Sequence, residues 1–299
     1  MVKKDFISIT DHDAKTINHL IRQAYNLKAQ ARAGKKHELL QGESLAMIFD
    51  KPSTRTRVSF DVAMYELGGH AINITAGECG LGTRESVPDV ARTLSRFCDA
   101  LMVRTFGHDI ALGLAEHASV PVINGLTDLM HPCQAMADAL TMYEITGDLK
   151  GVRLTYIGDA NNVTNSLLHL AEKTGIELTV CTPKNYAPDK KMAAENKVFL
   201  TNDPAAAVKK ADFIYTDVWA SMGQEKLAAQ KNKAFRDYQV NSQLLKKAPK
   251  KVKIMHCLPA HRGLEITDEV IDDPEKSIVF EQAENRLHAQ KAILVYLLK

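Results

Sequence analysis

The sequence lacks both long apolar runs and paired cysteines. Its longest apolar run, residues 292–298, has seven residues, far fewer than the roughly 20 that a membrane-spanning helix needs. The five cysteines are scattered, and none forms a CxxC pair or a Cys/His zinc spacing. Because the first residues also lack the apolar core of a signal peptide, we expect a cytoplasmic protein with reduced thiols and no bound metal.

An excess of one charge is also missing. The formal net charge is +2, which gives no reason to expect a nucleic-acid or membrane partner, so any anion must bind at a local cluster. The patterns GxGxxG and GxxxxGK(S/T) do not occur in the sequence. We therefore expect neither a dinucleotide site nor nucleotide-driven phosphoryl transfer, and no cofactor.

The sequence does contain apolar segments that alternate with helical patterns, and its 299 residues fit about two domains. Strands are expected at residues 44–49, 71–74, 100–103, 121–123, 152–157, 177–180, 198–200, 212–216, 253–256 and 277–280. Helices are expected at residues 54–67, 86–97, 131–145, 163–173 and 283–298. This alternation predicts an α/β fold with two doubly wound domains, each a parallel sheet flanked by helices. In such sheets ligands bind beyond the carboxyl ends of the strands.

Two of the expected helices carry apolar residues at helical spacing, which predicts one buried face for each helix. These residues are Val58, Val62 and Tyr65 in the helix at 54–67, and Val90, Leu94 and Phe97 in the helix at 86–97.

A basic and hydroxyl-rich segment, Lys51-Pro52-Ser53-Thr54-Arg55-Thr56-Arg57, directly follows the strand expected at 44–49. Ser and Thr cap backbone N–H groups at a helix start, and these groups and the helix dipole together form an anion site. Arginine adds forked donors that suit phosphate. A capped surface helix with solvated arginines explains the pattern equally well. However, cations are disfavoured at a helix N-terminus, so the arginines hint at a bound anion.

Two further motifs place polar side chains at the ends of elements. Arg104 follows the strand expected at 100–103, where it could be a surface cap or a ligand clamp. His131-Pro132-Cys133-Gln134 opens a helix, whose N-terminus should keep His131 neutral and able to donate to a carbonyl. Gln134 lies one turn further on. By themselves, His131 and Gln134 could also form only a polar helix cap.

Three motifs stand out in the second half of the chain. Asp217 begins Asp-Val-Trp-Ala-Ser-Met-Gly-Gln at a strand end, where a carboxylate can bind an ammonium group. Trp219 is explained equally by packing, and Ser-Met-Gly says little by chemistry alone. Cys257, in His-Cys-Leu-Pro, is most simply a buried core residue, although a thiolate could orient or deprotonate an amine. Arg286, in Glu-Asn-Arg, could be a residue of a helix surface.

In their order along residues 6–298, these motifs resemble those of the aspartate/ornithine carbamoyltransferase family. The resemblance implies that the phosphate of carbamoyl phosphate is held by Ser53, Thr54, Arg55 and Thr56, with Arg57 helping or braced nearby. Arg104 would bridge the phosphate and the carbamoyl oxygen, and His131 would polarise the carbamoyl C=O. The other implied contacts to carbamoyl phosphate are Gln134, Cys257, the Leu258 carbonyl, Arg286 and Gly77. Gly77 stands in a loop that reaches a neighbouring subunit in this family, at a position that is often Gln.

Ser-Met-Gly and His-Cys-Leu-Pro match the ornithine branch of the family. Asp217 would hold the amino-acid ammonium group and Cys257 would orient the attacking amine, acting as a base only secondarily. The remaining contacts to ornithine would be Asn162, Ser221 and Met222, with Asn161 as a less certain neighbour. The implied catalytic residues are Arg104, His131, Asp217 and Cys257. The implied reaction moves the carbamoyl group from carbamoyl phosphate to the side-chain amine of L-ornithine, giving L-citrulline and phosphate, as in arginine biosynthesis.

The resemblance also implies an architecture and an assembly. Residues 1–146 would form a carbamoyl-phosphate-binding domain, with residues 283–299 packing back on it, and residues 147–282 an ornithine-binding domain. The active site would lie in the cleft between the domains, in a homotrimer or a larger trimer-based assembly. Two other functions remain open: a sister carbamoyltransferase that uses aspartate, putrescine or an N-acylated ornithine, and a non-catalytic regulatory binding module.

Overall fold

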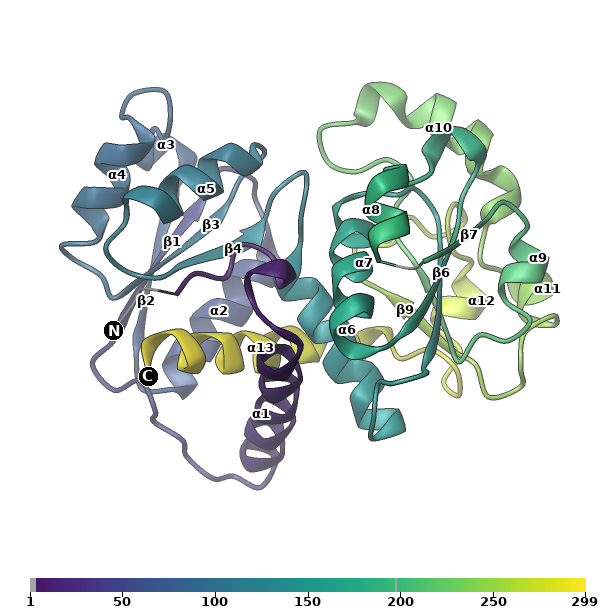
Figure 1. Ribbon diagram of the computed structural model, residues 1–299, viewed down its shortest axis with the longest axis horizontal. Coiled ribbons are helices and arrows are strands. Elements are labelled where there is room, and N and C mark those ends of the chain that lie inside the picture. The colour runs from purple at the N-terminus through teal and green to yellow at the C-terminus, as the bar shows by residue number, and fades with distance from the viewer. Residues whose placement is uncertain (1–3, 197) are drawn as a thin grey trace. The chain divides into compact units, whose positions relative to one another are not determined.

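The computed structural model describes residues 4–196 and 198–299. Residues 1–3, with which the first predicted domain begins, lie outside the described residues. The chain divides into two compact units (Figure 1). Unit 1 comprises residues 1–140 and 284–299, and unit 2 comprises residues 141–283.

The described part of each unit contains one parallel β-sheet. In unit 1 the strand order is β2-β1-β3-β4, and in unit 2 it is β7-β6-β5-β8-β9. Every pair of neighbouring strands in these sheets runs parallel. The predicted class, α/β with two parallel sheets flanked by helices, is therefore confirmed.

The described part of unit 1 contains four strands, which are β1 (Ser44–Phe49), β2 (His70–Thr75), β3 (Ala100–Arg104) and β4 (Val122–Leu126). Its helices are α1 (Ala14–Arg32), α2 (Thr54–Glu66), α3 (Ala76–Cys79), α4 (Val87–Leu94) and α5 (His108–His117). Two further helices, α6 (Pro132–Thr146) and α13 (Val279–Leu298), continue from one unit into the other.

Among its described residues, unit 2 contains five strands, which are β5 (Arg153–Ile157), β6 (Glu177–Cys181), β7 (Phe199–Thr201), β8 (Phe213–Thr216) and β9 (Lys253–His256). Its helices are α7 (Asn162–Thr174), α8 (Lys190–Glu195), α9 (Pro204–Ala207), α10 (Ala228–Phe235), α11 (Ser242–Leu245) and α12 (Asp268–Ile271). None of the helices among the described residues combines the length and the apolar character needed to cross a membrane.

The sheet of unit 1 is covered on both faces. Alternate side chains of a strand face opposite sides of the sheet, and Ala46 and Ile48 of β1 share a buried apolar cluster with Val90 of α4 and Leu114 of α5. Figure 1 shows α4 and α5 on one side of this sheet and α2 and α13 on the other. Because helices cover both faces of the sheet, polar side chains of a site are expected in the loops at the carboxyl ends of the strands.

The sheet of unit 2 brings together three segments that carry predicted site residues. β5, β8 and β9 are neighbours in the sheet, with Ile157 beside Thr216 and Thr216 beside His256. Because these three residues end parallel strands, the segments that follow them begin at the same edge. These segments begin with Gly158, Asp217 and Cys257.

The position of α2 agrees with the prediction, but its buried face does not. Val58 and Tyr65 are 53% and 80% exposed, while the buried residues of the helix are Thr56, Phe60, Ala63 and Met64. The helix has apolar residues on two faces, and spacing alone does not say which face meets the sheet. In the same way Phe97, predicted to lie on the buried face of the next helix, is 74% exposed and follows the end of α4.

Two expectations about elements need correction. The strand predicted at residues 277–280 is wrong, because Ser277 forms only an isolated bridge with Ile254 and α13 begins at Val279. Ile278 and Val279 of this short run are buried where the helix begins, whereas Phe280 is 63% exposed. The prediction also missed α1, although Ile17, Leu20, Ile21 and Ala24 recur at helical spacing after the N-cap residue Asp13.

Candidate active site

The basic segment after β1 forms the start of α2. Ser53 is the N-cap residue, and its Oγ accepts a hydrogen bond from the Thr56 N–H at 3.3 Å. Thr56 is fully buried, whereas Arg55 is exposed. The first N–H groups of a helix have no partner inside it, so this end of α2 can present backbone donors and the Arg55 guanidinium to an anion.

Arg104 lies beside this segment at the end of β3. Its carbonyl oxygen accepts hydrogen bonds from the N–H groups of Asp50 and Lys51, at 2.9 and 3.2 Å. These bonds fix the beginning of the basic segment to the end of β3. Arg104 is half-buried, so it is not a freely solvated surface residue.

Arg286 connects three of the predicted segments of unit 1. It lies in α13 and is 4% exposed. Its Nη1 donates to Gln134 Oε1 at 3.0 Å, and its Nη2 donates to Thr56 Oγ1 at 3.1 Å. Both acceptors are neutral oxygens, so these two bonds do not cancel the positive charge. Arg286 is therefore part of a buried polar cluster rather than a residue of an exposed helix surface.

His131 lies immediately before α6 and is 6% exposed. Burial, together with the positive charges of Arg286, Arg104 and Arg55, holds the pKa of His131 well below its usual value. The ring is therefore neutral near pH 7, as predicted, although the main causes are burial and three arginines rather than the helix N-terminus. A neutral imidazole can donate a hydrogen bond to a developing oxyanion.

Gly77 is exposed and lies in the short helix α3. The loop predicted there is a single helical turn followed by a hydrogen-bonded turn, in which the Arg84 N–H donates to the Gly80 carbonyl at 2.9 Å. Gly80 has a φ of 59°, a left-handed conformation that glycine adopts without steric cost. A substrate contact from Gly77 stays a prediction.

In unit 2, Asp217 directly follows β8 and is 6% exposed. Asn161 Nδ2 donates to Asp217 Oδ2 at 2.8 Å, and Asn161 Oδ1 accepts the Val163 N–H at 2.9 Å as the N-cap of α7. Asn162 is the first residue of α7. As the N-cap residue of α7, Asn161 is held against the Asp217 carboxylate. The neighbouring Asn162 lies at the same edge of the sheet.

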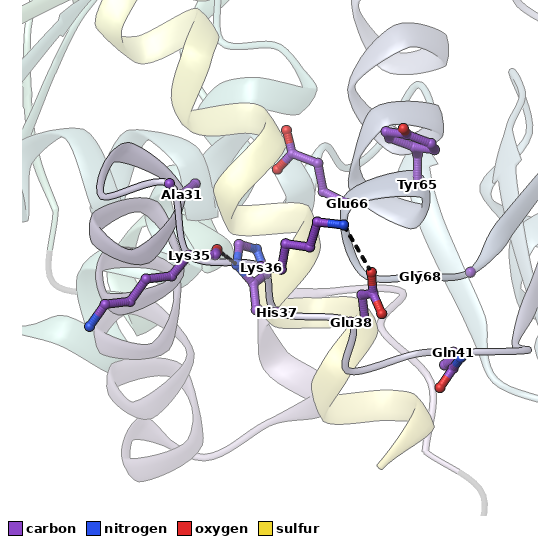
Figure 2. Close-up of a pocket in the computed structure, with 11 residues that line it drawn as sticks. Ala31, Lys35, Lys36, His37, Glu38, Gln41, Tyr65, Glu66 and Gly68 are labelled. Atoms are coloured by element: carbon purple, nitrogen blue, oxygen red, sulfur yellow. Dashed lines mark hydrogen bonds and ion pairs between the residues drawn. The ribbon is translucent and has the colours of Figure 1, made fainter.

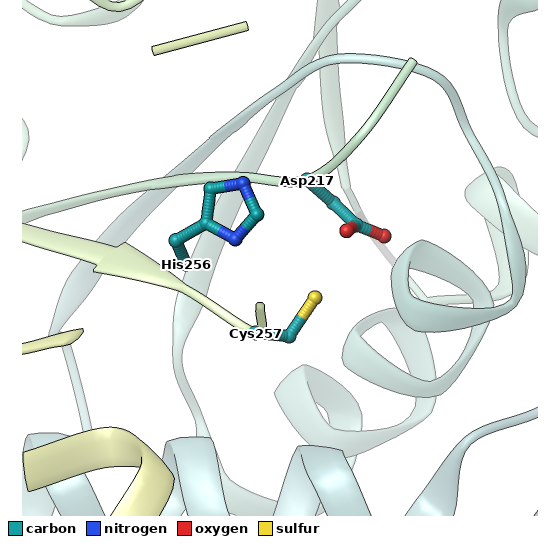
Figure 3. Close-up of side chains that lie close together, drawn as sticks. All are labelled: Asp217, His256 and Cys257. Carbon is teal, nitrogen blue, oxygen red and sulfur yellow. The ribbon is translucent and has the colours of Figure 1, made fainter. Parts of the chain in front are cut away.

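Cys257 follows β9, the strand next to β8, and is half-buried. Its Sγ lies in a group with an Asp217 carboxylate oxygen and a His256 ring nitrogen, in which all three atoms are within 4.8 Å of one another. Figure 3 shows the thiol pointing toward the Asp217 side of this group. Cys257 is therefore partly exposed, unlike the buried Cys133 and Cys181.

The donor set of Asp217, His256 and Cys257 fits a metal poorly, because both ring nitrogens of His256 are engaged. Nδ1 accepts the Leu258 N–H at 2.9 Å, so Nε2 carries the hydrogen and donates to Glu265 Oε1 at 3.1 Å. The side chains of His256 and Glu265 are both 0% exposed. Leu258 has a φ of 58°, which is costly for a residue with a Cβ. The His256 ring thus helps to hold Leu258 in this conformation.

Ser221 and Met222 lie in the segment between β8 and α10. Ser221 is half-buried and Met222 is 48% exposed. The Ser221 N–H donates to Gln224 Oε1 across 3.4 Å, a long hydrogen bond. Both side chains are accessible to a ligand from this position, and their predicted contacts with ornithine stay predictions.

Comparison with known proteins explains this distribution of residues over the two units. Residues 4–144 match the model of the carbamoyl-P binding domain of aspartate/ornithine carbamoyltransferases. Residues 150–297 match the model of the Asp/Orn binding domain of the same enzymes. The chain belongs to the aspartate/ornithine carbamoyltransferase family. The chain therefore contains both domains of the family and is a carbamoyltransferase.

Several members of the carbamoyltransferase family are similar over nearly their full length. An ornithine carbamoyltransferase of Pyrococcus horikoshii is 51% identical, covering 99% of this chain and 96% of the relative. The solved structure of ornithine carbamoyltransferase from Pyrococcus furiosus superposes with a TM-score of 0.94 at 50% identity, covering 99% of this chain and 97% of that one. The structure from Thermus thermophilus gives a TM-score of 0.92 at 42% identity, with both chains fully covered.

Sequence reasoning missed two polar groups in this carbamoyltransferase. One is Glu265, whose carboxylate holds His256. The other is Lys231 of α10, whose Nζ donates to Asp159 Oδ2 and to Gln224 Oε1, both at 2.6 Å. Asp159 lies two residues before Asn161, a predicted neighbour of ornithine, but Lys231 is 72 residues away and carries no local signal.

A cavity of about 580 Å³ in unit 1 is not part of this carbamoyltransferase site. It is lined by the end of α1, the segment that follows α1 and the end of α2 (Figure 2). None of the residues predicted to bind substrate lines it. Its lysines Lys35 and Lys36 are exposed, and the same lining contains the carboxylates Glu38 and Glu66. Glu38 lies 4.0 Å from Lys36, so the cavity has mixed charge and no evident ligand chemistry.

Proposed function

We propose that this protein transfers the carbamoyl group of carbamoyl phosphate to the side-chain amine of L-ornithine, forming L-citrulline and phosphate. The relatives at about 50% identity are named ornithine carbamoyltransferase. One of them, from Pyrococcus furiosus, is named anabolic, which favours the biosynthetic direction.

The observation that carries the proposal is the cationic cluster of unit 1. Arg55, Arg104 and Arg286 all act on the pKa of one buried neutral histidine, His131. Several cations beside one site favour an anionic ligand, and arginine matches the geometry of phosphate oxygens. We infer that carbamoyl phosphate binds here, with Ser53, Thr54 and Thr56 supplying further donors and Arg57 supporting the same helix turn.

The amino-acid substrate is assigned to unit 2. Asp217 is a nearly buried carboxylate at a strand end, and it suits the ornithine ammonium group. Asn162, Ser221 and Met222 would contact the rest of the amino-acid head. Cys257 stands beside Asp217 and would orient the side-chain amine. The Leu258 carbonyl and Gln134 would hold the carbamoyl NH₂ group.

The proposed reaction is a direct acyl transfer. The lone pair of the neutral amine attacks the carbamoyl carbon, a C–N bond forms, and the C–O bond to phosphate breaks. The proton that the amine nitrogen loses leaves with the phosphate. His131, Arg104 and Thr56 would stabilise the charge that develops on the carbamoyl oxygen, while the arginines take up the departing phosphate. Holding both substrates in attack geometry would supply much of the acceleration. The reaction therefore requires that the residue sets of both units act on one pair of bound substrates.

We also propose a cytoplasmic homotrimer. All five cysteines are thiols without a disulfide, as expected in a reducing compartment. Unit 1 exposes Tyr65, Phe97 and Val58 at 80%, 74% and 53%, and large exposed apolar side chains are typical of subunit interfaces. Light scattering on the purified protein tests the assembly, and a monomer mass at micromolar concentration would exclude the trimer.

The test of the reaction is citrulline formation from carbamoyl phosphate, with ornithine, putrescine, N-acetylornithine and aspartate compared in parallel. We expect turnover that strongly prefers ornithine. Preference for another amine would keep the carbamoyl-phosphate site and overturn the assignment of Ser221 and Met222. Absence of turnover with all four amines, together with binding of carbamoyl phosphate, would indicate a non-catalytic binding module instead.

A further inference from the structure

The segment between β8 and α10, residues 217–224, is attached at two points to one face of α10. Lys231 and Phe235 are four residues apart, so they lie on the same side of this helix, and both are buried. Lys231 contacts Gln224, and Phe235 contacts Trp219. Ser221 and Met222, the proposed contacts to the amino acid, lie between the two attachment points.

The apolar attachment is formed by Trp219 and Phe235. Trp219 is 3% exposed and Phe235 is 0% exposed. Their rings stack with centroids 5.8 Å apart and an angle of 21° between the ring planes. This contact fixes the part of the segment that is nearer to Asp217.

The polar attachment is formed by Lys231. This lysine is 5% exposed, and its ammonium group bridges Gln224 Oε1 and Asp159 Oδ2, both at 2.6 Å. Burial raises the pKa of Asp159 and the Lys231 charge opposes this shift. A buried cation is tolerated only with such partners, so the geometry of Gln224 depends on Lys231.

The same lysine connects two strand ends. Asp159 follows β5, and two residues later Asn161 donates to the Asp217 carboxylate. Lys231 therefore lies at the junction of the segment that carries Asn162 and the segment that carries Ser221 and Met222.

We propose that Lys231 is a positioning residue for the amino-acid substrate, which holds Gln224, and through it Ser221 and Met222, at the place where ornithine binds. The inference rests on the proposed function, because it assigns the 217–224 segment to ornithine. Lys231 touches neither substrate nor reacting atoms in this proposal. It affects the affinity for the amine and leaves the carbamoyl-phosphate site unchanged.

The experiment compares Lys231→Met with a matched control, Lys233→Met, in which an exposed lysine of the same helix is changed. We expect Lys231→Met to raise the KM for ornithine by roughly 10- to 100-fold, the loss of a charged hydrogen bond. The KM for carbamoyl phosphate should change less than about twofold, and Lys233→Met should change neither. Lys231→Arg should restore part of the ornithine affinity, because it keeps a cation at this position.

A second readout does not depend on activity. Trp219 is the only tryptophan in the chain, so its fluorescence reports the 217–224 segment alone. We expect Lys231→Met to red-shift the emission and to increase quenching by acrylamide, with an unchanged far-UV circular dichroism spectrum. Should Lys231→Met fail to fold, Gln224→Leu removes the same bond without leaving a buried charge, and the same rise in the KM for ornithine is expected.

The proposed function and the role of Lys231 fail in different ways. If the wild-type protein prefers another amine, the proposed substrate is wrong, and the KM comparison is repeated with that amine. If the wild type uses ornithine but Lys231→Met or Gln224→Leu leaves the KM for ornithine unchanged, the positioning role is wrong. Equal increases in both KM values would also overturn it, since they would indicate a general structural defect.

Discussion

The two units solve different binding problems with different arrangements of charge. In unit 1 burial and the cations Arg286, Arg104 and Arg55 lower the pKa of His131, and the hydrogen bonds of Arg286 to Gln134 and Thr56 go to uncharged oxygens. In unit 2 the buried Asp159 is paired with the cation Lys231, and the neutral ring of His256 donates a hydrogen bond to the Glu265 carboxylate.

The difference fits the two substrates that we propose. A phosphate ligand brings its own negative charge, so its site can hold an excess of positive charge until the ligand arrives. An amino acid brings charges of both signs, so its site gains selectivity from the placement of a few polar groups rather than from net charge. Unit 1 would therefore set the affinity for the donor, and unit 2 would set the choice of acceptor.

The largest effect is expected from His131, because it would act on the oxyanion itself. We expect His131→Ala to lower kcat by about 10²- to 10³-fold, the usual cost of losing one oxyanion donor, with much smaller changes in both KM values. His131→Gln keeps an amide donor and should retain more activity than the alanine variant. Steady-state kinetics on both variants measures this, and a decrease of less than about fivefold in kcat for His131→Ala would remove the histidine from the oxyanion site.

The sequence predicted the positions of these residues in the fold because they form local motifs. Ser53 was predicted as a helix cap, and Asp217 and Cys257 were placed at strand ends, which are decided by a few neighbouring residues. The partners of these residues were not predictable in the same way. Arg286 meets Gln134 across 152 residues, and no local pattern encodes such a pair. Similarly, the apolar residues of α2 identified a helix, but its buried face depends on how the helix packs against the sheet.

A pair of variants tests whether the donor and acceptor sites are separate, as the charge comparison requires. Arg55→Gln should raise the KM for carbamoyl phosphate by roughly 10- to 100-fold, because a charged hydrogen bond to phosphate is lost. Asp217→Asn should raise the KM for ornithine by a similar factor, because the ammonium group loses its counter-charge. Each variant should change the other KM by less than about threefold.

Both KM values are measured with the second substrate at saturation. Two exposed residues provide controls: Arg92→Gln in unit 1 and Asp237→Asn in unit 2 remove the same kinds of charge away from the site. If Arg55→Gln impaired ornithine binding as strongly as carbamoyl-phosphate binding, the two sites would not be divided between the units in the proposed way.

The smallest expected effect is on the stability of the folded protein in acid, which should differ between the two units. The pKa values of His12, His108, His131 and His288 in unit 1 are lowered, mainly by burial, whereas His169 is the histidine with a lowered pKa among the described residues of unit 2. When folding lowers the pKa of a histidine, the stability that this histidine contributes is fully present at pH values above its unfolded pKa of about 6.5. That stabilisation is lost as the pH falls toward the folded value, so unit 1 should be the more acid-sensitive unit.

His288 allows a quantitative test, because burial and the nearby Lys291 and Lys28 lower its pKa to about 4. When the pH falls from 7.5 to 5.5, His288 should lower the free energy of unfolding of the wild type by about 1 kcal/mol. The variant His288→Gln should not show this loss. Urea unfolding measures this at both pH values. Trp219 fluorescence follows unit 2, while far-UV circular dichroism follows both units, so the two transitions should separate at pH 5.5 with the fluorescence change at the higher urea concentration. If the fluorescence transition came first, the groups that determine stability in acid would lie in unit 2. In that case His131 would not limit the stability of this fold.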